Sequence, residues 1–229
     1  MQLIEQAICA LKRGSFVLIH DDTRRENEVD MVIAAEHIKP RNIEIMRKKA
    51  GGLICLAISH KITKKLGLMY LSDILRSSAR PNSILSKIIV DKTPYGDRPS
   101  FSLSINHIDT FTGITDVDRA LTISKMADVC RKIDSGGIEE FANSFRAPGH
   151  VPLLIASNNL LEERTGHTEL SIYLMQISRL VPAVVICEML DSTTHRSLSI
   201  NKAKNYANKF GIVLVESNQL IRSYSRVAN

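Results

Sequence analysis

Three carboxylates recur at every second position near the start of the chain, at Glu26, Glu28 and Asp30. In an extended backbone, residues two apart point to the same face, so this spacing predicts three acids in one row. Apolar runs at 16–19 and 31–35 flank the row and are expected to form buried strands. A row of acids between buried strands is costly unless a cation or a reaction uses it, whereas the alternative is a solvated hairpin tip with surface charges.

A second polar group spans residues 164–169, with the sequence Arg-Thr-Gly-His-Thr-Glu. Gly166 permits a tight turn before a helix, and Thr168 is expected to cap that helix. The first amides of a helix, with Arg164 beside them, favour a phosphate group. His167 could ligate a metal or move a proton, and the alternative is a capped helix with a surface histidine.

Three further polar residues adjoin apolar runs or turns. His150 follows Pro-Gly at the expected entrance of a strand, where a structural histidine is commoner than a catalytic one. Glu188 ends the apolar run 183–187, and it could serve as an acid or base or simply face water. Thr112 belongs to a glycine turn before a helix, which could bind an anion or cap the helix.

The elements that must position these groups alternate between helix-like and strand-like segments along the 229 residues. Residues 76–99 contain three prolines and a glycine, which predicts a long surface loop of the kind that forms lids or binding loops. The mixture predicts one compact α/β (α+β) domain over residues 1–229, with a mixed sheet and surrounding helices. Helices are expected at 4–11, 40–49, 59–66, 118–132, 167–180, 199–209 and the chain end, and further strands at 53–58, 101–106, 151–155, 183–187 and 212–215.

Composition narrows the class of protein. The net charge of +6 suits anionic partners, but only 5% of residues are aromatic and no aromatic-basic stripe occurs, which argues against nucleic acid. No apolar run approaches the roughly 20 residues that span a bilayer, and the N-terminus lacks the pattern of a secretory signal. Four scattered cysteines fit buried thiols in a reducing cytoplasm better than disulfides or zinc. Motifs of metalloproteases, α/β-hydrolases, P-loop proteins and dinucleotide-binding domains are absent from the sequence.

Taken together, the motifs resemble those of the 3,4-dihydroxy-2-butanone 4-phosphate synthase family over essentially the whole chain. Several separate motifs in the same order are far more specific than any one of them. The lack of an added domain resembles the stand-alone form of the family. The segments that carry the resemblance are Asp22, 25–28, Asp30, 51–55, 112–115, 118–119, 148–150, 166–169 and 186–188.

The resemblance implies a magnesium-dependent conversion of D-ribulose 5-phosphate into L-3,4-dihydroxybutan-2-one 4-phosphate and formate, in riboflavin biosynthesis. Enediolate formation, dehydration, a carbon shift and formate loss are the expected steps, carried out by a homodimer with active sites near its interface. Glu26 and His167 are expected to hold the metal, with Mn²⁺ as an alternative because histidine is a less typical Mg²⁺ ligand. His150 and Glu188 are expected to be essential for catalysis. The expected substrate-binding residues are Arg25, Glu26, Asp30, Thr112, Arg164, Thr165, Gly166, His167 and Thr168.

Some positions depart from the family pattern. Val29 stands where glycine is common, Thr165 replaces a smaller residue, and the segment 191–195 differs from the usual Asn-Asp-Asp-Gly type. The role of Glu28 and the residue that removes the first proton stay open. Two other functions compete: a different metal-dependent sugar-phosphate isomerase or lyase, and a non-enzymatic protein that binds phosphorylated ligands or RNA.

Overall fold

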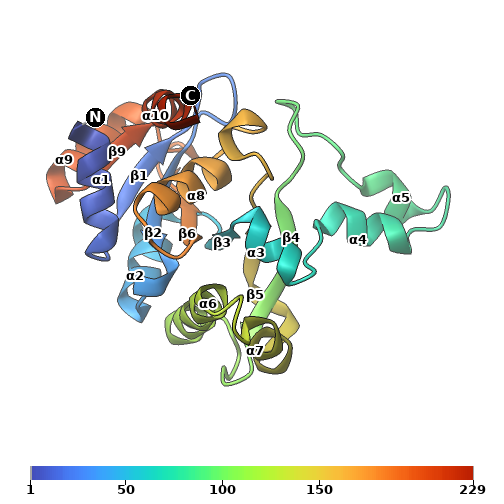
Figure 1. Ribbon diagram of the computed structural model, residues 1–229. Helices are drawn as coiled ribbons and strands as arrows, with labels where there is room; N and C mark the ends of the chain where they lie inside the picture. The colour runs from blue at the N-terminus through green and yellow to red at the C-terminus, as the bar shows by residue number, and fades with distance from the viewer. Residues whose placement is uncertain (1, 229) are drawn as a thin grey trace.

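One mixed sheet of seven strands runs through the protein, in the order β4-β5-β3-β6-β2-β1-β9 (Figure 1). The computed structural model describes residues 2–228. Strands β1 and β9 are parallel, as are β3 and β5, while the other neighbours in this sheet are antiparallel. The bounds are β1 Val17–His20, β2 Val29–Ala34, β3 Cys55–Ile58, β4 Phe101–His107, β5 Phe145–Ile155, β6 Ala183–Glu188 and β9 Val213–Glu216.

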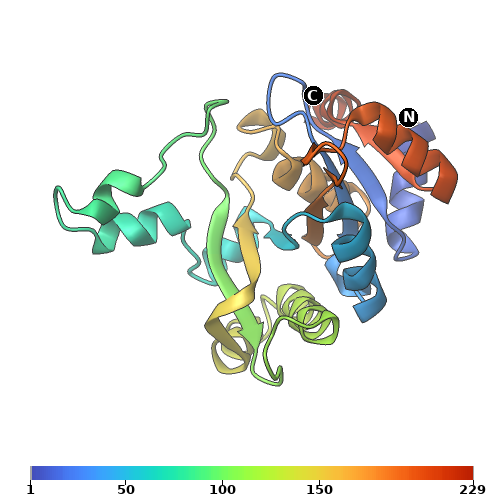
Figure 2. The same ribbon diagram turned by 180° about the vertical axis from the view of Figure 1, so that it is seen from behind.

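Helices cover both faces of this sheet, which explains why the central strands read as continuous apolar runs (Figures 1 and 2). On one face, Leu170 packs in a core cluster with Ile19 and Val32; on the other, Ile123 packs in a cluster with Met31. The first face carries α1 (Gln2–Lys12), α8 (His167–Ile177) and α10 (Ser217–Ala228), and the second carries α2 (Pro40–Ile45), α6 (Asp116–Arg131) and α9 (Ile200–Phe210).

Strand β2 places one charged side chain inside the first of these layers. Alternate residues of a strand point to opposite faces, so Asp30 points to the same face as Val32 and Ala34, toward α8. All six residues of β2 are buried, and Asp30 is 1% exposed. The fold therefore puts a carboxylate in an apolar layer, where only a partner, a cation or a proton can compensate it.

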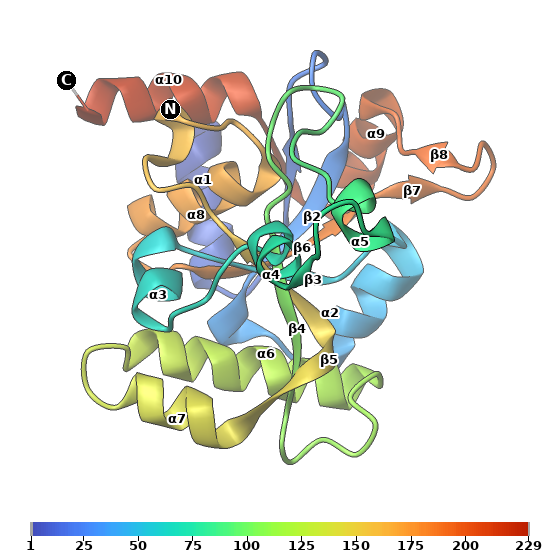
Figure 3. The ribbon, with the colours of Figure 1, turned by 90° about the vertical axis from the view of Figure 1, so that its right-hand side faces the viewer.

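Two short helices project from the body beside β4, as Figures 1 and 2 show, and they face the viewer in Figure 3. They are α4 (Leu71–Ser78) and α5 (Ile84–Ile88), and the side-chain oxygen of Ser83 caps α5 by accepting a hydrogen bond from the Ser86 amide. The prediction of a loop throughout 76–99 is therefore wrong in part, because this cap stabilises a helical turn that hydrophobic periodicity does not reveal.

The remaining segments refine the expected boundaries. β5 begins at Phe145, so His150 lies inside a strand rather than at its entrance. The helix predicted at 40–49 is interrupted, because α2 passes into a π-helical turn at Met46–Ala50. The other elements are turns at Ala35–His37 and Leu160–Glu162, α3 His60–Lys65, α7 Gly137–Ser144 and a hairpin of β7 Leu190–Asp191 with β8 Arg196–Ser197.

The prediction of one α/β domain with a mixed sheet and surrounding helices is confirmed. Of the cysteines, Cys55, Cys130 and Cys187 are buried free thiols and Cys9 is an exposed one. Among the described helices, none combines the length and apolar character that crossing a membrane requires.

Candidate active site

The loop between β1 and β2 forms the centre of the site, and Asp21 shapes it. The Asp21 carboxylate accepts hydrogen bonds from the backbone amides of Glu26 (3.1 Å) and Glu28 (2.9 Å), and it pairs with Arg25 at 3.2 Å. Asn27 adopts a left-handed conformation with φ 53°. Asp21 thus folds the loop back on itself, and the sequence pattern gave no signal for this role beyond an acid at the end of an apolar run.

The three acids do not form the single row that their spacing predicted. The left-handed turn at Asn27 separates Glu26, which lies in the loop, from Asp30, which lies in β2. Glu28 lies just before the strand, where its carboxylate accepts a hydrogen bond from the hydroxyl of Ser197 in the β7–β8 hairpin. Burial raises the pKa of Glu28, opposed by the hydrogen bond from Ser197 and reinforced by repulsion from Glu26.

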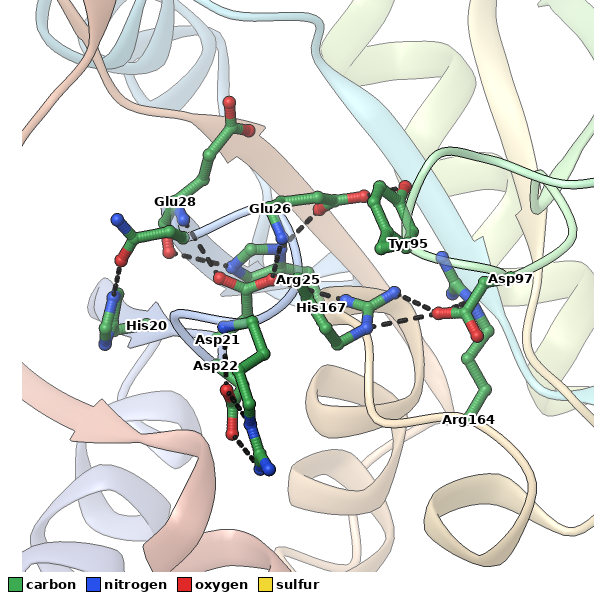
Figure 4. Close-up of polar contacts among 12 residues, drawn as sticks. His20, Asp21, Asp22, Arg25, Glu26, Glu28, Tyr95, Asp97, Arg164 and His167 are labelled. Carbon is green, nitrogen blue, oxygen red and sulfur yellow. Dashed lines mark hydrogen bonds and ion pairs between the residues drawn. The ribbon is translucent and has the colours of Figure 1, made fainter.

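His167, the first residue of α8, connects the helix to the acids of the loop (Figure 4). Its Nδ1 lies 3.3 Å from Glu26 Oε2, and its Nε2 lies 3.2 Å from the carbonyl oxygen of Glu28 and 3.8 Å from Asp30 Oδ1. The side chain is 5% exposed. Burial alone would lower the pKa of His167, but the nearby Asp30 and Glu26 carboxylates raise it to about 9. With acceptors at both ring nitrogens, the imidazole is cationic when no metal is bound.

The acids around His167 differ in their proton affinities. Burial would raise the pKa of Glu26, but hydrogen bonds from His167 and Tyr95 lower it to about 2. Asp30 behaves in the opposite way, because complete burial raises its pKa to about 7 despite the neighbouring His167. The two carboxylates therefore differ chemically: Glu26 is a permanent anion, whereas Asp30 can gain or lose a proton near neutral pH.

Glu188 lies beside Asp30 because β2 and β6 are paired in register at these two residues. The amide of Leu53 donates to Glu188 Oε2 at 2.7 Å, and the amide of Gly52 donates to the Glu188 carbonyl oxygen at 3.0 Å. The double-glycine turn that precedes β3 thus fixes the carboxylate at the end of β6. A Cβ on Gly52 would lie 2.8 Å from the Glu188 Cβ, so only glycine leaves room for this arrangement.

Two arginines, Arg25 and Arg164, define the other side of the site, and Arg25 is held by Asp21 as described above. Arg164 donates to Glu169 at 2.6 Å, and the buried Glu169 also accepts the amide of Ser157 at 3.0 Å. Gly166 directly precedes α8 in an extended conformation with a φ of −83°, and a Cβ there would lie 2.8 Å from the Arg164 guanidinium. The expected cap at Thr168 is wrong, since α8 begins at His167 and leaves Thr168 inside its first turn.

The segment after α5 supplies two residues that sequence reasoning missed. The Tyr95 hydroxyl donates to Glu26 Oε1, and the Asp97 carboxylate accepts from Arg25. Burial and, as the second cause, the hydrogen bond to Glu26 raise the pKa of Tyr95 to about 12. Their only signal was the proline- and glycine-rich composition of 76–99, which indicated a binding loop without indicating which residues bind.

The donor set fits a divalent cation. Ligand atoms of Asp21, Glu26 and His167 lie within 4.8 Å of one another, and the buried Asp30 Oδ1 has no hydrogen-bond partner among the described residues. Three N–H donors already engage Asp21, so Glu26 and His167 are the better ligands. Because Nε2 of His167 faces a carbonyl oxygen, Nδ1 is the nitrogen that could ligate a cation once its proton leaves.

Two expected site residues lie away from this cluster. His150 Nδ1 is 3.2 Å from the side chain of Asn106, and Thr112 donates to the Asp118 carboxylate at 3.4 Å. β5 is separated from β2 by β3 and β6, which at roughly 4.8 Å per strand amounts to about 14 Å. One chain therefore brings together Arg25, Glu26, Asp30, Arg164, His167 and Glu188, but it does not bring His150 or Thr112 to them.

Comparison with known proteins identifies relatives over nearly the whole chain. The sequence profile described as 3,4-dihydroxy-2-butanone 4-phosphate synthase matches residues 5–223. A protein of that name from Methanothermobacter thermautotrophicus is 44% identical over 222 residues, which cover 97% of this chain and 96% of that protein. One from Archaeoglobus fulgidus is 43% identical, covering 97% of this chain and 94% of that protein.

Solved structures agree with the sequence relatives. A crystal structure of 3,4-dihydroxy-2-butanone 4-phosphate synthase in complex with two magnesium ions superimposes with a TM-score of 0.78. It is 26% identical in sequence, and the match covers 97% of this chain and 96% of that one. Because the match covers nearly the whole chain, the likeness is one of the complete fold rather than of a single motif.

Proposed function

The chain belongs to the 3,4-dihydroxy-2-butanone 4-phosphate synthase family, and from that premise we propose that it converts D-ribulose 5-phosphate into L-3,4-dihydroxybutan-2-one 4-phosphate and formate. It is an enzyme of riboflavin biosynthesis. The observation that carries the proposal is the convergence of Glu26 and His167 beside Asp30 and Glu188. Five substrate carbons become four in the phosphate ester and one in formate, so a carbon–carbon bond is cleaved.

Mg²⁺ is the cofactor, and Glu26 and His167 are its proposed protein ligands, with Mn²⁺ as the alternative. A divalent cation supplies Lewis-acid stabilisation of negative charge on substrate oxygens. The chain's own groups then bind, orient and transfer protons. Arg25 and Arg164, with the first amides of α8, provide positive charge for the substrate phosphate. Gly166 gives Arg164 its space, while Thr165 and Thr168 flank the same turn.

Proton transfer requires groups whose pKa lies near the working pH. Asp30 meets that requirement, because burial raises its pKa to about 7. Its Oδ1 atom is available for proton transfer, since it forms no hydrogen bond with any described residue. Glu188 adjoins it in the sheet and is fixed by the Leu53 amide. We assign Asp30 to sugar binding and proton exchange, Glu188 and His150 to the catalytic proton transfers, and leave Glu28 as a supporting acid.

A homodimer would complete the site. His150 and Thr112 lie on one surface, because the Asn106 side chain contacts His150 and lies against Gly113, the neighbour of Thr112. That surface includes Phe111, 98% exposed, and Ile114, 51% exposed. Such apolar exposure beside expected site residues fits a surface that a second copy covers. We therefore propose that Thr112 and His150 serve the cluster of the other subunit. We also place the enzyme in the cytoplasm, since its buried free thiols suit a reducing compartment.

Formate release is the direct test of the proposed reaction. Incubated with ribulose 5-phosphate and Mg²⁺, the protein is expected to release one formate per sugar consumed, and EDTA is expected to abolish the release because the cation stabilises the charge that develops on substrate oxygens. Coupled formate dehydrogenase measures the yield. An isomerase would consume the sugar without formate, and an RNA-binding protein would leave the sugar intact, so either result rejects the proposal.

Replacing Gly52 by alanine tests the position of Glu188. The added methyl group would overlap Glu188, and displacing a catalytic carboxylate by about 1 Å is expected to lower kcat on the order of tenfold to a hundredfold. Gly67→Ala is the matched control, because an alanine there meets no atom within 4 Å even though its φ of 67° strains it. Comparable kcat values for the two variants, measured by formate release, would show that Glu188 needs no such fixed position.

A further inference from the structure

We propose that Asp97 occupies the place of the substrate phosphate between Arg25 and Arg164, and that substrate binding must displace it. This inference rests on the proposed function, which supplies the phosphate. Figure 4 shows the Asp97 carboxylate between the two guanidinium groups. Asp97 Oδ2 accepts from Arg25 Nε at 3.1 Å and from Arg25 Nη2, and it lies 3.5 Å from Arg164 Nε.

The two arginines are nearly enclosed, so the anion between them is a defined feature of the site. Their side chains are 10% and 13% exposed, against 25% for Asp97. Arg164 Nε is buried and forms no hydrogen bond with any described residue, although the Asp97 carboxylate lies 3.5 Å away. One carboxylate is thus too small for this pair of guanidinium groups, whereas a phosphate offers three peripheral oxygens at wider spacing.

Of the acids that contact the arginines, Asp97 is the one that can leave without unfolding the site. Asp21 holds Arg25 but also accepts the amides of the β1–β2 loop. Glu169 holds Arg164 but also accepts the Ser157 amide and is completely buried. Among the described residues, the Asp97 carboxylate contacts only the two guanidinium groups.

The backbone around Asp97 is a closed turn that could move as a unit. The amide and hydroxyl of Thr93 both donate to the Asp97 carbonyl oxygen, at 2.7 and 3.0 Å, and Gly96 has a φ of 93°. Arg98 anchors the end of the turn on the projecting helices, where its guanidinium lies 4.0 Å above the Tyr70 ring. A phosphate between the two arginines would need the N–H groups of Arg25 and Arg164 that face Asp97, so it cannot bind there beside the Asp97 carboxylate, and phosphate entry must push the turn outward.

The experiment measures binding of inorganic phosphate by calorimetry, without metal and at fixed ionic strength, to wild type, Asp97→Asn and Asp91→Asn. Asparagine keeps the shape but removes the competing charge, so Asp97→Asn is expected to bind phosphate about fivefold to tenfold more tightly. Asp91→Asn is the matched control, because Asp91 lies in the same segment but pairs with Arg76. It is expected to bind phosphate as wild type does.

A second measurement follows the position of the turn itself, in the wild type and in Asp97→Asn. Trypsin cleavage after the exposed Lys92 is expected to accelerate when phosphate saturates the wild type, and to be fast in Asp97→Asn without phosphate. Unchanged or weaker phosphate binding by Asp97→Asn overturns the inference, as does cleavage of wild type that phosphate leaves unchanged. Neither readout needs turnover, so failure of the proposed reaction and failure of this inference are told apart.

Discussion

Glu26→Gln is expected to lower kcat about a thousandfold, equivalent to about 4 kcal/mol of lost transition-state stabilisation. The substitution removes the one carboxylate of the cluster whose pKa is lowered to about 2, so the site loses its permanent anion. A neutral amide can still accept the bond from Tyr95, and the side chain is 27% exposed, so the fold should persist. His167→Ala is expected to cause a comparable loss.

Mg²⁺ titration by calorimetry, together with formate release, separates loss of the metal from loss of the fold. Both variants should fail to bind Mg²⁺ at millimolar concentrations while retaining the circular dichroism spectrum of the wild type. Glu44→Gln serves as the matched control, because this glutamate is a partly exposed residue of α2 that pairs with Lys48. Near-normal turnover by Glu26→Gln would contradict the assignment of this residue as a metal ligand.

Mixed dimers of Glu26→Gln and His150→Ala are expected to recover about a quarter of wild-type activity, although each variant alone is nearly inactive. Random mixing makes about half of the dimers heterodimeric, and in each of these one of the two sites takes both intact residues. The physical reason is the placement of His150, three strands away from Asp30 in the sheet of its own chain.

The formate assay is run on the random mixture and also on the heterodimer isolated by co-expression with two different affinity tags, for which one intact site of two raises the expected recovery to about half. The pairing of a Glu26→Gln subunit with a His167→Ala subunit is the matched negative control. Glu26 and His167 of one chain belong to the same cluster, so each of the two sites in this mixed dimer contains one substituted residue. Recovery in the control, or none in the test pair, would show that the sites are not shared between subunits in the way proposed.

Local sequence patterns predicted the framework because burial imposes a period on each segment. The covered strand β3 and the first five residues of β6 read as continuous apolar runs, and the edge strand β4 alternates. The local patterns gave a wrong prediction at 76–99, where a single capping serine stabilises α5, and at Asn27, whose positive φ breaks the expected row of acids. Such features depend on one or two hydrogen bonds or on one backbone angle, which hydrophobic period does not encode.

The candidate site divides in a similar way. Residue types and their order identified Glu26, His167, Asp30 and Glu188, because each lies beside a strand or helix end that the sequence marks. Asp97 gave no comparable signal, since nothing local distinguishes it from other loop acids. Its contact with Arg25 joins residues 72 positions apart, and it arises only after the segment beyond α5 folds back over the loop.

By itself, the sequence determined the class of fold, the buried faces and the chemical groups available, since these follow from the side chains and their local spacing. Only the tertiary structure decided which groups meet. Packing of α8 against the sheet brings His167 to Glu26 across 141 positions, and register between β2 and β6 brings Glu188 to Asp30. These contacts result from the burial of many apolar side chains at once, so no local stretch of residues can specify them.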